Sequence, residues 1–256
     1  MNKLFAIAVL LCFVSVRAAL STELTILTEN LPALNYLENG VLVGPSVEIV
    51  KEIQKRTGSY GKIKVYPWAR AYRIALEEEN VVLFSTTLTE ERRDKFKWVG
   101  PLALKRDVLV ARKGAGIAIT TLDDAKKVKR IGTVRNDSKE EYLQQQGFTN
   151  LEPVSDDKKN AQKLILGRID LWVHKVPGLR SVCELARVDY NDVEEVYSLR
   201  KIELMIAFSK QTSDLIVQKW KNAFNDMAAD GTILKIQRKW NRLIPDPPFP
   251  ELPAKP

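Results

Sequence analysis

The chain has 256 residues, of which 45% are hydrophobic and 28% are charged, and its formal net charge at pH 7 is +8. These fractions are ordinary for a globular protein and argue against a disordered chain, a collagen-like repeat or a membrane protein with many spans. With one histidine and two cysteines, the chain is also poorly equipped for a zinc site or a Ser-His-Asp arrangement.

The first 18 residues have the pattern of a cleavable export signal. Lys3 precedes an apolar run over 4–16, and Val16 and Ala18 suit the small-residue positions before a cut after Ala18. The run is shorter than the roughly 20 residues that a membrane-spanning helix needs, although an uncleaved anchor is the alternative. We therefore expect a periplasmic protein whose mature part keeps Cys183 as its single cysteine and forms no disulfide.

Apolar periodicity predicts alternating strands and helices in the first part of the chain. Strands are expected over 23–28, 62–66 and 81–85, and helices over 47–56 and 69–79. The run over 81–85 is almost wholly apolar, which is typical of a strand inside a parallel sheet. This order predicts an α/β unit with a parallel core.

The same alternation starts again after a strand expected over 105–112. Helices are expected over 122–128, 139–146 and 158–166, and strands over 130–134, 151–154 and 169–173. A strand over 203–208 and helices over 214–229 and 232–240 follow. The proline-rich tail over 245–256 is expected to be extended and loosely held.

Positive and negative residues are interleaved along most of the chain, as in 90–95 and 156–159. Interleaving indicates a solvated surface, and no nucleic-acid-binding motif accompanies it, so we expect no nucleic-acid partner. The sequence also lacks a P-loop, a G-x-G-x-x-G, an H-E-x-x-H and a G-x-S-x-G motif. His174 has no apparent nucleophile to serve and is interpreted as a structural or loop histidine.

The segment FSTTLTEERRDKFKWVGP, over 84–101, carries the first chemical signal. Ser85 and Thr87 leave the end of an expected strand, where ligands bind in open α/β sheets, and Thr89 can cap the helix that follows. Arg92 lies one turn into that helix, so its guanidinium could bind a carboxylate beside the two hydroxyls. The alternative is that Arg92 and Arg93 are exposed helix charges, and the residues alone do not decide between the two.

The pattern S-x-T-x-T-x-E-R followed by F-x-W-V-G-P resembles the family 3 extracellular solute-binding proteins, the receptors of polar amino acid ABC transporters. The likeness extends over about 23–243. Other matching stretches are TENLPALNYLENGVLVGPSVEIVKEI, IGTVRNDS, LGRIDLW and DGTILKIQRKW. Each stretch alone is weak, but their order and spacing together are fairly specific.

The resemblance implies the two-lobed α/β fold of a type II periplasmic binding protein. Two crossover strands, near 108–112 and 204–208, would form the hinge between lobe one (19–108 plus 205–256) and lobe two (109–204). The implied protein is a monomer and not an enzyme, and it needs no metal or cofactor. Its partners would be a small-molecule ligand and the membrane permease of an ABC transporter.

Several implied contacts concern the ligand's carboxylate. Arg92 falls on the family's arginine that grips the α-carboxylate. Ser85 and Thr87 fall on the strand-end contacts of the first lobe, and Ser138 falls on a hydroxyl of the second lobe.

Other implied contacts concern the rest of the ligand. Glu29 falls where an acid can meet the ligand's side chain, and Trp68 where an aromatic ring often flanks it, although a core tryptophan is an equal alternative. Arg70 is a second-rank candidate. Where many amino-acid receptors place an aspartate for the α-ammonium, after the strand GRIDLWVHKV, this chain has Lys175, which would repel an ammonium at close range.

Two competing functions stay open. One is an enzyme on the same scaffold, resembling cyclohexadienyl dehydratase, with Glu29 or His174 as general acid or base. The other is a sensory receptor that feeds a signalling protein instead of importing a solute. The main expectation is a receptor for a small carboxylate-bearing solute, an amino acid or a relative of one.

Overall fold

The computed structural model describes residues 23–250 and 252, so the expected export signal over 1–18 lies outside the described residues. The strands are β1 (Thr25–Thr28), β2 (Tyr36–Glu38), β3 (Val41–Val43), β4 (Ile63–Val65), β5 (Val81–Thr87), β6 (Phe96–Arg112), β7 (Ile131–Val134), β8 (Leu151–Val154), β9 (Leu171–Val176) and β10 (Val193–Ser209). The helices are α1 (Pro45–Thr57), α2 (Trp68–Glu77), α3 (Glu90–Arg93), α4 (Leu122–Lys127), α5 (Ser138–Gln145), α6 (Asp157–Ile165), α7 (Leu179–Leu185), α8 (Asp214–Ala229) and α9 (Thr232–Trp240), with a 3-10 turn at Tyr190–Asp192.

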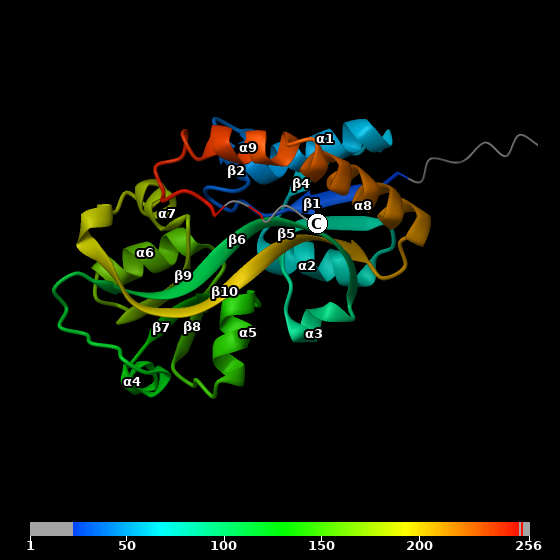
Figure 1. Cartoon of the computed structure of the whole chain (residues 1–256). Coiled ribbons are helices and arrows are strands. Elements are labelled where there is room, and N and C mark those ends of the chain that lie inside the picture. The colour runs from blue at the N-terminus through cyan, green and yellow to red at the C-terminus, as the bar shows by residue number, and fades with distance from the viewer. Residues whose placement is uncertain (1–22, 251, 253–256) are drawn as a thin grey trace, which may run out of the picture.

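Eight of the strands form one sheet in the order β4-β1-β5-β10-β6-β9-β7-β8, with helices on both of its faces (Figure 1). The pairs β1–β4, β1–β5, β7–β8 and β7–β9 are parallel. Strands β5 and β9 each pair antiparallel with one of the two central strands, β10 and β6. The mixed α/β architecture predicted from the alternating elements is therefore confirmed.

The central strands β6 and β10 are each 17 residues long and run from one half of the sheet into the other (Figure 1). They pair antiparallel along their length, from Phe96 opposite Ser209 to Arg112 opposite Val193. The sequence predicted only 105–112 and 203–208 as strands. The remainder was missed because these segments are only partly buried, so their apolar residues do not alternate regularly.

The buried core is divided along the sheet as well as across it. In β6, Val108 packs under α6 and α7, whereas its neighbour Leu109 packs under α4 and α5 on the opposite face. In β1, Ile26 packs against α1, α8 and α9, whereas Leu27 packs against α2. Because successive side chains of a strand point to opposite faces, each half of the sheet buries two separate apolar layers.

A small β2–β3 hairpin was missed by the sequence reading. Its turn is Asn39-Gly40, and both residues have positive φ, of 50° and 80°. An Asn-Gly pair is a strong signal for this kind of turn. The flanking strands have only three residues each, which is too few to establish an alternating pattern.

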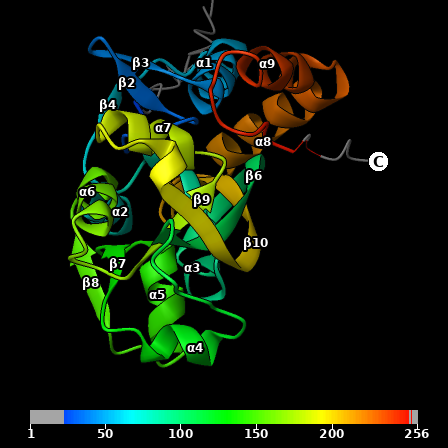
Figure 2. The ribbon, with the colours of Figure 1, turned by 90° about the vertical axis from the view of Figure 1, so that its left-hand side faces the viewer.

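The C-terminal tail is tied down more firmly than its proline content predicted. Phe249 is buried, and its backbone N–H donates to Asn241 Oδ1 at 2.9 Å. Asp246 is also buried and accepts the backbone N–H groups of Gly178 and Arg180 at 2.8 and 2.9 Å. The expectation of a loosely held tail is therefore wrong here, because these residues supply an apolar side chain and acceptors. Figure 2 shows the tail passing from α9 toward α7.

In the part of the chain that the structure describes, no helix combines the length and the apolar character needed to cross a membrane.

Candidate ligand-binding site

A narrow cavity of about 10 Å³ lies where the two halves of the sheet meet. It contains every predicted site residue except Arg70. Its lining consists of Glu29, Leu31, Trp68, Ser85, Thr87, Arg92, Lys105, Asp137, Ser138, Lys139, Lys175 and Leu204. These residues come from the ends of β1 and β5, from α2 and α3, and from β6, β9, β10 and the start of α5.

Ser85 holds an unusual position at the end of β5. Its φ is 59°, a left-handed conformation that costs free energy for a residue with a Cβ and that clusters at functional sites. Its hydroxyl donates to Asn35 Oδ1 at 2.6 Å, and Asn35 Nδ2 donates in turn to Thr28 Oγ1 and Glu29 O, both at 2.8 Å. The network fixes the Ser85 oxygen and links both strand ends that face the cavity.

Arg92 is 1% exposed, so the alternative that it is an exposed helix charge is wrong. Its guanidinium carbon lies 5.0 Å from the centre of the Trp68 ring and 4.7 Å from that of Tyr72. Its Nη2 forms an ion pair with Glu141 Oε2 at 2.8 Å and donates to Asn136 O at 3.3 Å. Its Nε is buried and has no hydrogen-bond partner, so this side chain retains a donor for a carboxylate.

The neighbours of Arg92 in α3 behave differently from it. Arg93 is exposed and pairs with Glu90 at 3.1 Å, as expected of a surface charge. The predicted cap at Thr89 is wrong: its hydroxyl faces the Glu91 carboxylate at 3.4 Å and accepts no backbone N–H. The adjacent acid provides a competing partner for that hydroxyl.

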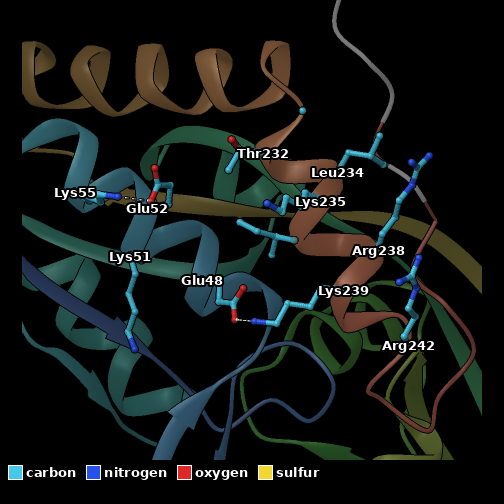
Figure 3. Close-up of a pocket in the computed structure, with 12 residues that line it drawn as sticks. Glu48, Lys51, Glu52, Lys55, Thr232, Leu234, Lys235, Arg238, Lys239 and Arg242 are labelled. Atoms are coloured by element: carbon cyan, nitrogen blue, oxygen red, sulfur yellow. Dashed lines mark hydrogen bonds and ion pairs between the residues drawn. The ribbon is translucent and has the colours of Figure 1, made fainter.

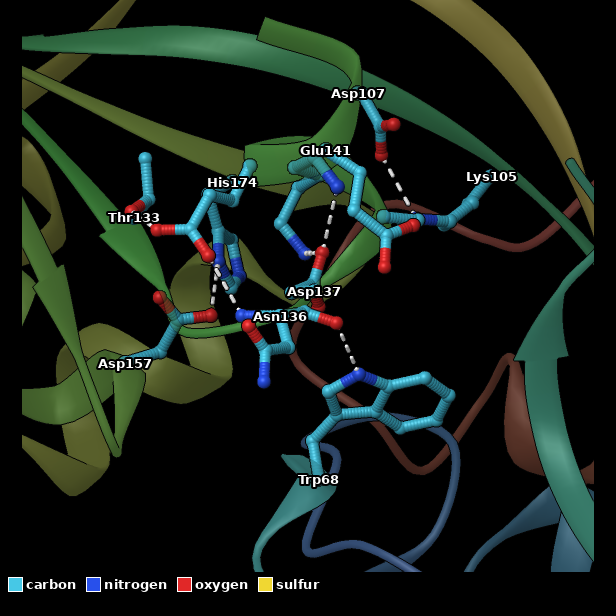
Figure 4. Close-up of polar contacts among 12 residues, drawn as sticks. Trp68, Lys105, Asp107, Thr133, Asn136, Asp137, Glu141, Asp157 and His174 are labelled. Carbon is cyan, nitrogen blue, oxygen red and sulfur yellow. Dashed lines mark hydrogen bonds and ion pairs between the residues drawn. The ribbon is translucent and has the colours of Figure 1, made fainter. Parts of the chain in front are cut away.

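Trp68 satisfies both of its proposed interpretations. It belongs to the apolar cluster under α2 and is 5% exposed, yet one edge lines the cavity. Its Nε1 donates to Asn136 O at 2.7 Å, across to the segment before α5 (Figure 4). The ring therefore supports Arg92 and joins the two sides of the cavity.

The start of α5 contributes charged residues that the sequence reading did not single out. Asp137 caps the helix and accepts both the backbone N–H and the Nζ of Lys139, each at 2.8 Å. Burial would raise the pKa of Asp137, but Lys139 and Lys105 lie close enough to hold that pKa below its usual range. Burial would also lower the pKa of Lys139, and the nearby Asp137 and Asp157 carboxylates raise it instead.

Lys105 was also missed, although it lies in a predicted strand. Its Nζ donates to Asp107 Oδ1 at 2.8 Å (Figure 4). Asp107 Oδ2 in turn accepts Arg200 Nε at 3.0 Å. Arg200 also donates to Ser138 O at 2.7 Å, so the chain of contacts reaches the start of α5. Burial lowers the pKa of Lys105. In a sequence, such a lysine is indistinguishable from the many surface lysines.

Glu29 and Lys175 are the two lining residues with the most perturbed environments. Burial, reinforced by the charge of Asp137, raises the pKa of Glu29 to about 8. Lys175 is 1% exposed, and its Nζ donates to two carbonyl oxygens, Pro32 O at 2.9 Å and Pro177 O at 3.1 Å. Burial lowers the pKa of Lys175 to about 8. None of the described residues places a carboxylate within 4.0 Å of its Nζ.

His174 lies beside this site without lining it. Its Nδ1 is 3.0 Å from Asp157 Oδ2 (Figure 4). The other oxygen of Asp157 accepts Trp172 Nε1 at 2.9 Å. Burial lowers the pKa of His174, which favours the neutral ring. This placement supports the structural interpretation of His174.

Arg70 lies outside the cavity and is exposed. Its guanidinium carbon is 4.2 Å from the centre of the Tyr66 ring. Tyr66 lines a wider groove of about 350 Å³ that shares Glu29 and Trp68 with the cavity. Arg70 is therefore a neighbour of the approach to the site and not part of its lining.

A larger groove, of about 930 Å³, lies between α1 and α9 (Figure 3). It is lined mainly by exposed charges, such as Lys51 and Lys235, and Glu48 pairs there with Lys239 at 2.5 Å. None of the predicted site residues lies in it. Size alone therefore does not identify the functional cavity, whereas the convergence of buried polar groups does.

Comparisons with known proteins show the family of this chain. The family model of the bacterial extracellular solute-binding proteins, family 3, matches residues 24–242. The L-cystine-binding protein TcyJ of Escherichia coli (strain K12) is 28% identical over 209 residues, which cover 79% of this chain and 76% of that protein.

Solved structures of this kind share the fold. An ancestral arginine-binding protein bound to arginine has a TM-score of 0.75 at 24% identity, covering 85% of this chain and 97% of its own. The arginine-, lysine-, histidine-binding protein ArtJ from Geobacillus stearothermophilus has a TM-score of 0.72 at 17% identity, covering 86% and 99%. The type II periplasmic binding protein fold is thereby confirmed, and the chain belongs to the family 3 bacterial extracellular solute-binding proteins.

Proposed function

We propose that this protein is a periplasmic receptor that captures a small carboxylate-bearing solute, an amino acid or a relative of one, for import by an ABC transporter. The observation that carries the proposal is Arg92, a fully buried guanidinium in the cavity with one donor nitrogen unpartnered. A guanidinium recognises a carboxylate by paired, charge-assisted hydrogen bonds. Burying such a cation is costly, which favours a role that uses its charge.

The proposed receptor consists of two lobes, over 19–108 plus 205–256 and over 109–204, with β6 and β10 as the hinge. The separate apolar layers in the two halves of the sheet support this division. Only the two long strands of the sheet continue from one half into the other. In the proposed mechanism the lobes close over the ligand, and the closed form docks on the permease.

The proposed roles follow from where the side chains lie. Arg92 holds the ligand's carboxylate, and Ser85, Thr87 and Ser138 surround it with hydroxyl and backbone groups. Trp68 forms a wall and keeps the guanidinium in place from one side. No cofactor or metal takes part in this mechanism, because binding needs only preorganised hydrogen bonds and burial.

A second candidate, an enzyme on the same scaffold, has one observation in its favour. Glu29 has a pKa of about 8 in an enclosed cavity, so it could exchange a proton near neutral pH. The curated relative is a binding protein, which favours the receptor. Incubation with prephenate or arogenate distinguishes the two, because a receptor returns the compound unchanged and an enzyme depletes it.

A thermal-shift screen of amino acids, dipeptides and organic acids tests the proposed function. A ligand that binds only the folded protein stabilises it and so raises the midpoint of thermal unfolding. At a free ligand concentration of 100 times Kd, the unfolding free energy increases by about 2.7 kcal/mol. We expect stabilisation by at least one small carboxylate. Stabilisation by none of these classes would overturn the proposal.

A further inference from the structure

The cavity lining has an excess of positive charge. It contains four cationic side chains, Arg92, Lys105, Lys139 and Lys175, but only two acidic ones, Glu29 and Asp137. Buried charges interact strongly because little water screens them. The charge of a ligand in this cavity must therefore suit an electropositive lining.

Three of these cations already have a carboxylate partner. Lys105 pairs with Asp107 and Lys139 pairs with Asp137, both at 2.8 Å. Arg92 pairs with Glu141 through one nitrogen. Lys175 differs from them, because its hydrogen-bond acceptors are two neutral carbonyl oxygens. A lysine ammonium has three N–H donors, so one of its donors is left over in the cavity lining.

The position of the Lys175 ammonium is built into the local backbone. A Cβ at position 178 would lie 2.1 Å from Lys175 Nζ, so the ammonium occupies space that the missing side chain of Gly178 leaves open. The acceptor Pro32 O comes from the segment after β1 and the acceptor Pro177 O from the segment after β9. The ammonium is thus held at the boundary between the two halves of the sheet.

No acidic residue of the lining offers an ionised, unpaired carboxylate to a ligand ammonium. Asp137 accepts the backbone N–H and the Nζ of Lys139 through Oδ1, each at 2.8 Å, and the charges of Lys139 and Lys105 balance that of its carboxylate. Glu29 lies near the negative charge of Asp137, and its pKa of about 8 keeps it mainly neutral at pH 7. Asp246 and Asp157 act on Lys175 only through space, so a ligand ammonium would meet a cation with no carboxylate in contact. A second acidic group on the ligand would instead give Lys175 a direct ion-pair partner.

We infer that the ligand is a small organic acid with two acidic groups and no ammonium, with one carboxylate held by Arg92 and the other acidic group held by Lys175. This inference rests on the proposed function. It narrows the ligand class from carboxylate-bearing solutes in general to dicarboxylates, including those with a 2-oxo group. Lys175 is the residue that sets this specificity, through the sign of its charge.

Isothermal titration calorimetry of the full mature protein with matched pairs tests the inference. The pairs are succinate against L-aspartate, and glutarate or 2-oxoglutarate against L-glutamate, because the members differ chiefly in the amino group. We expect a dicarboxylate to bind at least about tenfold more tightly than its amino acid counterpart, since one unpaired charge costs that much or more. Preferential binding of the amino acids would overturn the inference and leave the proposed function standing. Binding of no carboxylate at all would overturn both.

A variant separates the role of Lys175 from general stability. Lys175→Met removes the charge and keeps an apolar chain, and Lys210→Met at an exposed turn position is the matched control. We expect dicarboxylate affinity to fall about 10- to 100-fold in Lys175→Met and to stay unchanged in the control. The thermal midpoint of Lys175→Met without ligand reports whether it folds. A folded Lys175→Met with unchanged dicarboxylate affinity would contradict the inference.

Discussion

Arg92 and Glu141 form an ion pair at 2.8 Å that joins α3 to α5, and it thereby links the two sides of the cavity. The arginine side chain is 1% exposed and the glutamate side chain 26%. The pair places a protein carboxylate next to the group proposed to bind the ligand's carboxylate. Glu141 and the ligand are therefore expected to share the same guanidinium.

Glu141→Gln tests this relationship. The substitution removes the charge partner of a buried arginine, so we expect the unfolding free energy without ligand to fall by about 1–3 kcal/mol. The ligand's carboxylate then supplies the only countercharge, so the ligand-induced rise in thermal midpoint should be larger than in the wild-type protein. Equal shifts in both proteins would show that the ligand does not use this guanidinium.

Substitutions of Trp68 test whether its ring holds the Arg92 guanidinium in place. Trp68→Phe keeps an aromatic face but loses the hydrogen bond from Nε1 to Asn136 O. We expect a loss of about 1 kcal/mol in stability and a small loss in affinity. Trp68→Ala also removes the ring beside the guanidinium and should weaken binding further. Calorimetry on both variants checks the order, and equal affinities would contradict the positioning role.

We expect the raised pKa of Glu29 to make the unfolding free energy fall as the pH rises. Its pKa is about 8 in the folded protein and 4.5 in an unperturbed chain, so the folded state binds an extra proton between these values. The contribution of protonated Glu29 to the unfolding free energy is therefore fully present below pH 4.5. It is lost as the pH rises from 4.5 through 8, by at most about 1.4 kcal/mol per pH unit. Lys175 does not make the unfolding free energy change with pH between 4.5 and 8. Its pKa of about 8 means that it is protonated in both the folded and the unfolded state over this range, so the cost of burying its charge stays constant.

Denaturant unfolding between pH 5 and 8 measures this effect. Glu29→Gln cannot ionise, so the difference in stability between wild type and variant should shrink or reverse as the pH rises. A difference that stays constant over this range would mean that Glu29 keeps an ordinary pKa.

Asp246 is expected to stabilise the start of α7 from the C-terminal tail. It accepts backbone N–H groups from Gly178, Arg180 and Ser181, at 2.8, 2.9 and 3.1 Å. Asp246→Ala leaves these donors without a partner, so we expect a loss of about 2–3 kcal/mol in unfolding free energy. Asp226→Ala, at an exposed position in α8, is the control and should change stability little. Equal losses of unfolding free energy in the two variants would argue against a stabilising role of Asp246 at the start of α7.

Much of the fold could be predicted from the sequence, because helix and strand periodicity reflects local burial. The helices over 214–229 and 232–240 match α8 and α9. The full lengths of β6 and β10 could not be predicted, because half-buried strands with mixed polarity lack a clear pattern. The burial of Asp246 was hidden for a related reason, since its partners lie 65 or more positions away in the sequence.

Some residues of the candidate site could likewise be expected from the sequence, and others could not. Ser85 and Arg92 were expected near the ligand because of the family resemblance, since the residues alone left the role of Arg92 undecided, and both line the cavity. Lys105 and Lys139 could not, because each resembles an ordinary surface lysine until the fold buries it beside an aspartate. In the sequence, Lys175 stands out only as a departure from the family pattern, and the structure adds that its ammonium is buried and donates to carbonyl oxygens.

Calorimetric titration of Arg92→Gln tests the central claim most directly. The ligand found by the thermal-shift screen is titrated into wild type, Arg92→Gln and the exposed control Arg93→Gln, with circular dichroism confirming that each is folded. The account predicts at least about a 100-fold loss of affinity for Arg92→Gln, since a buried charge pair is lost, and no change for Arg93→Gln. Unchanged affinity in a folded Arg92→Gln would contradict the assignment of this cavity as the ligand site.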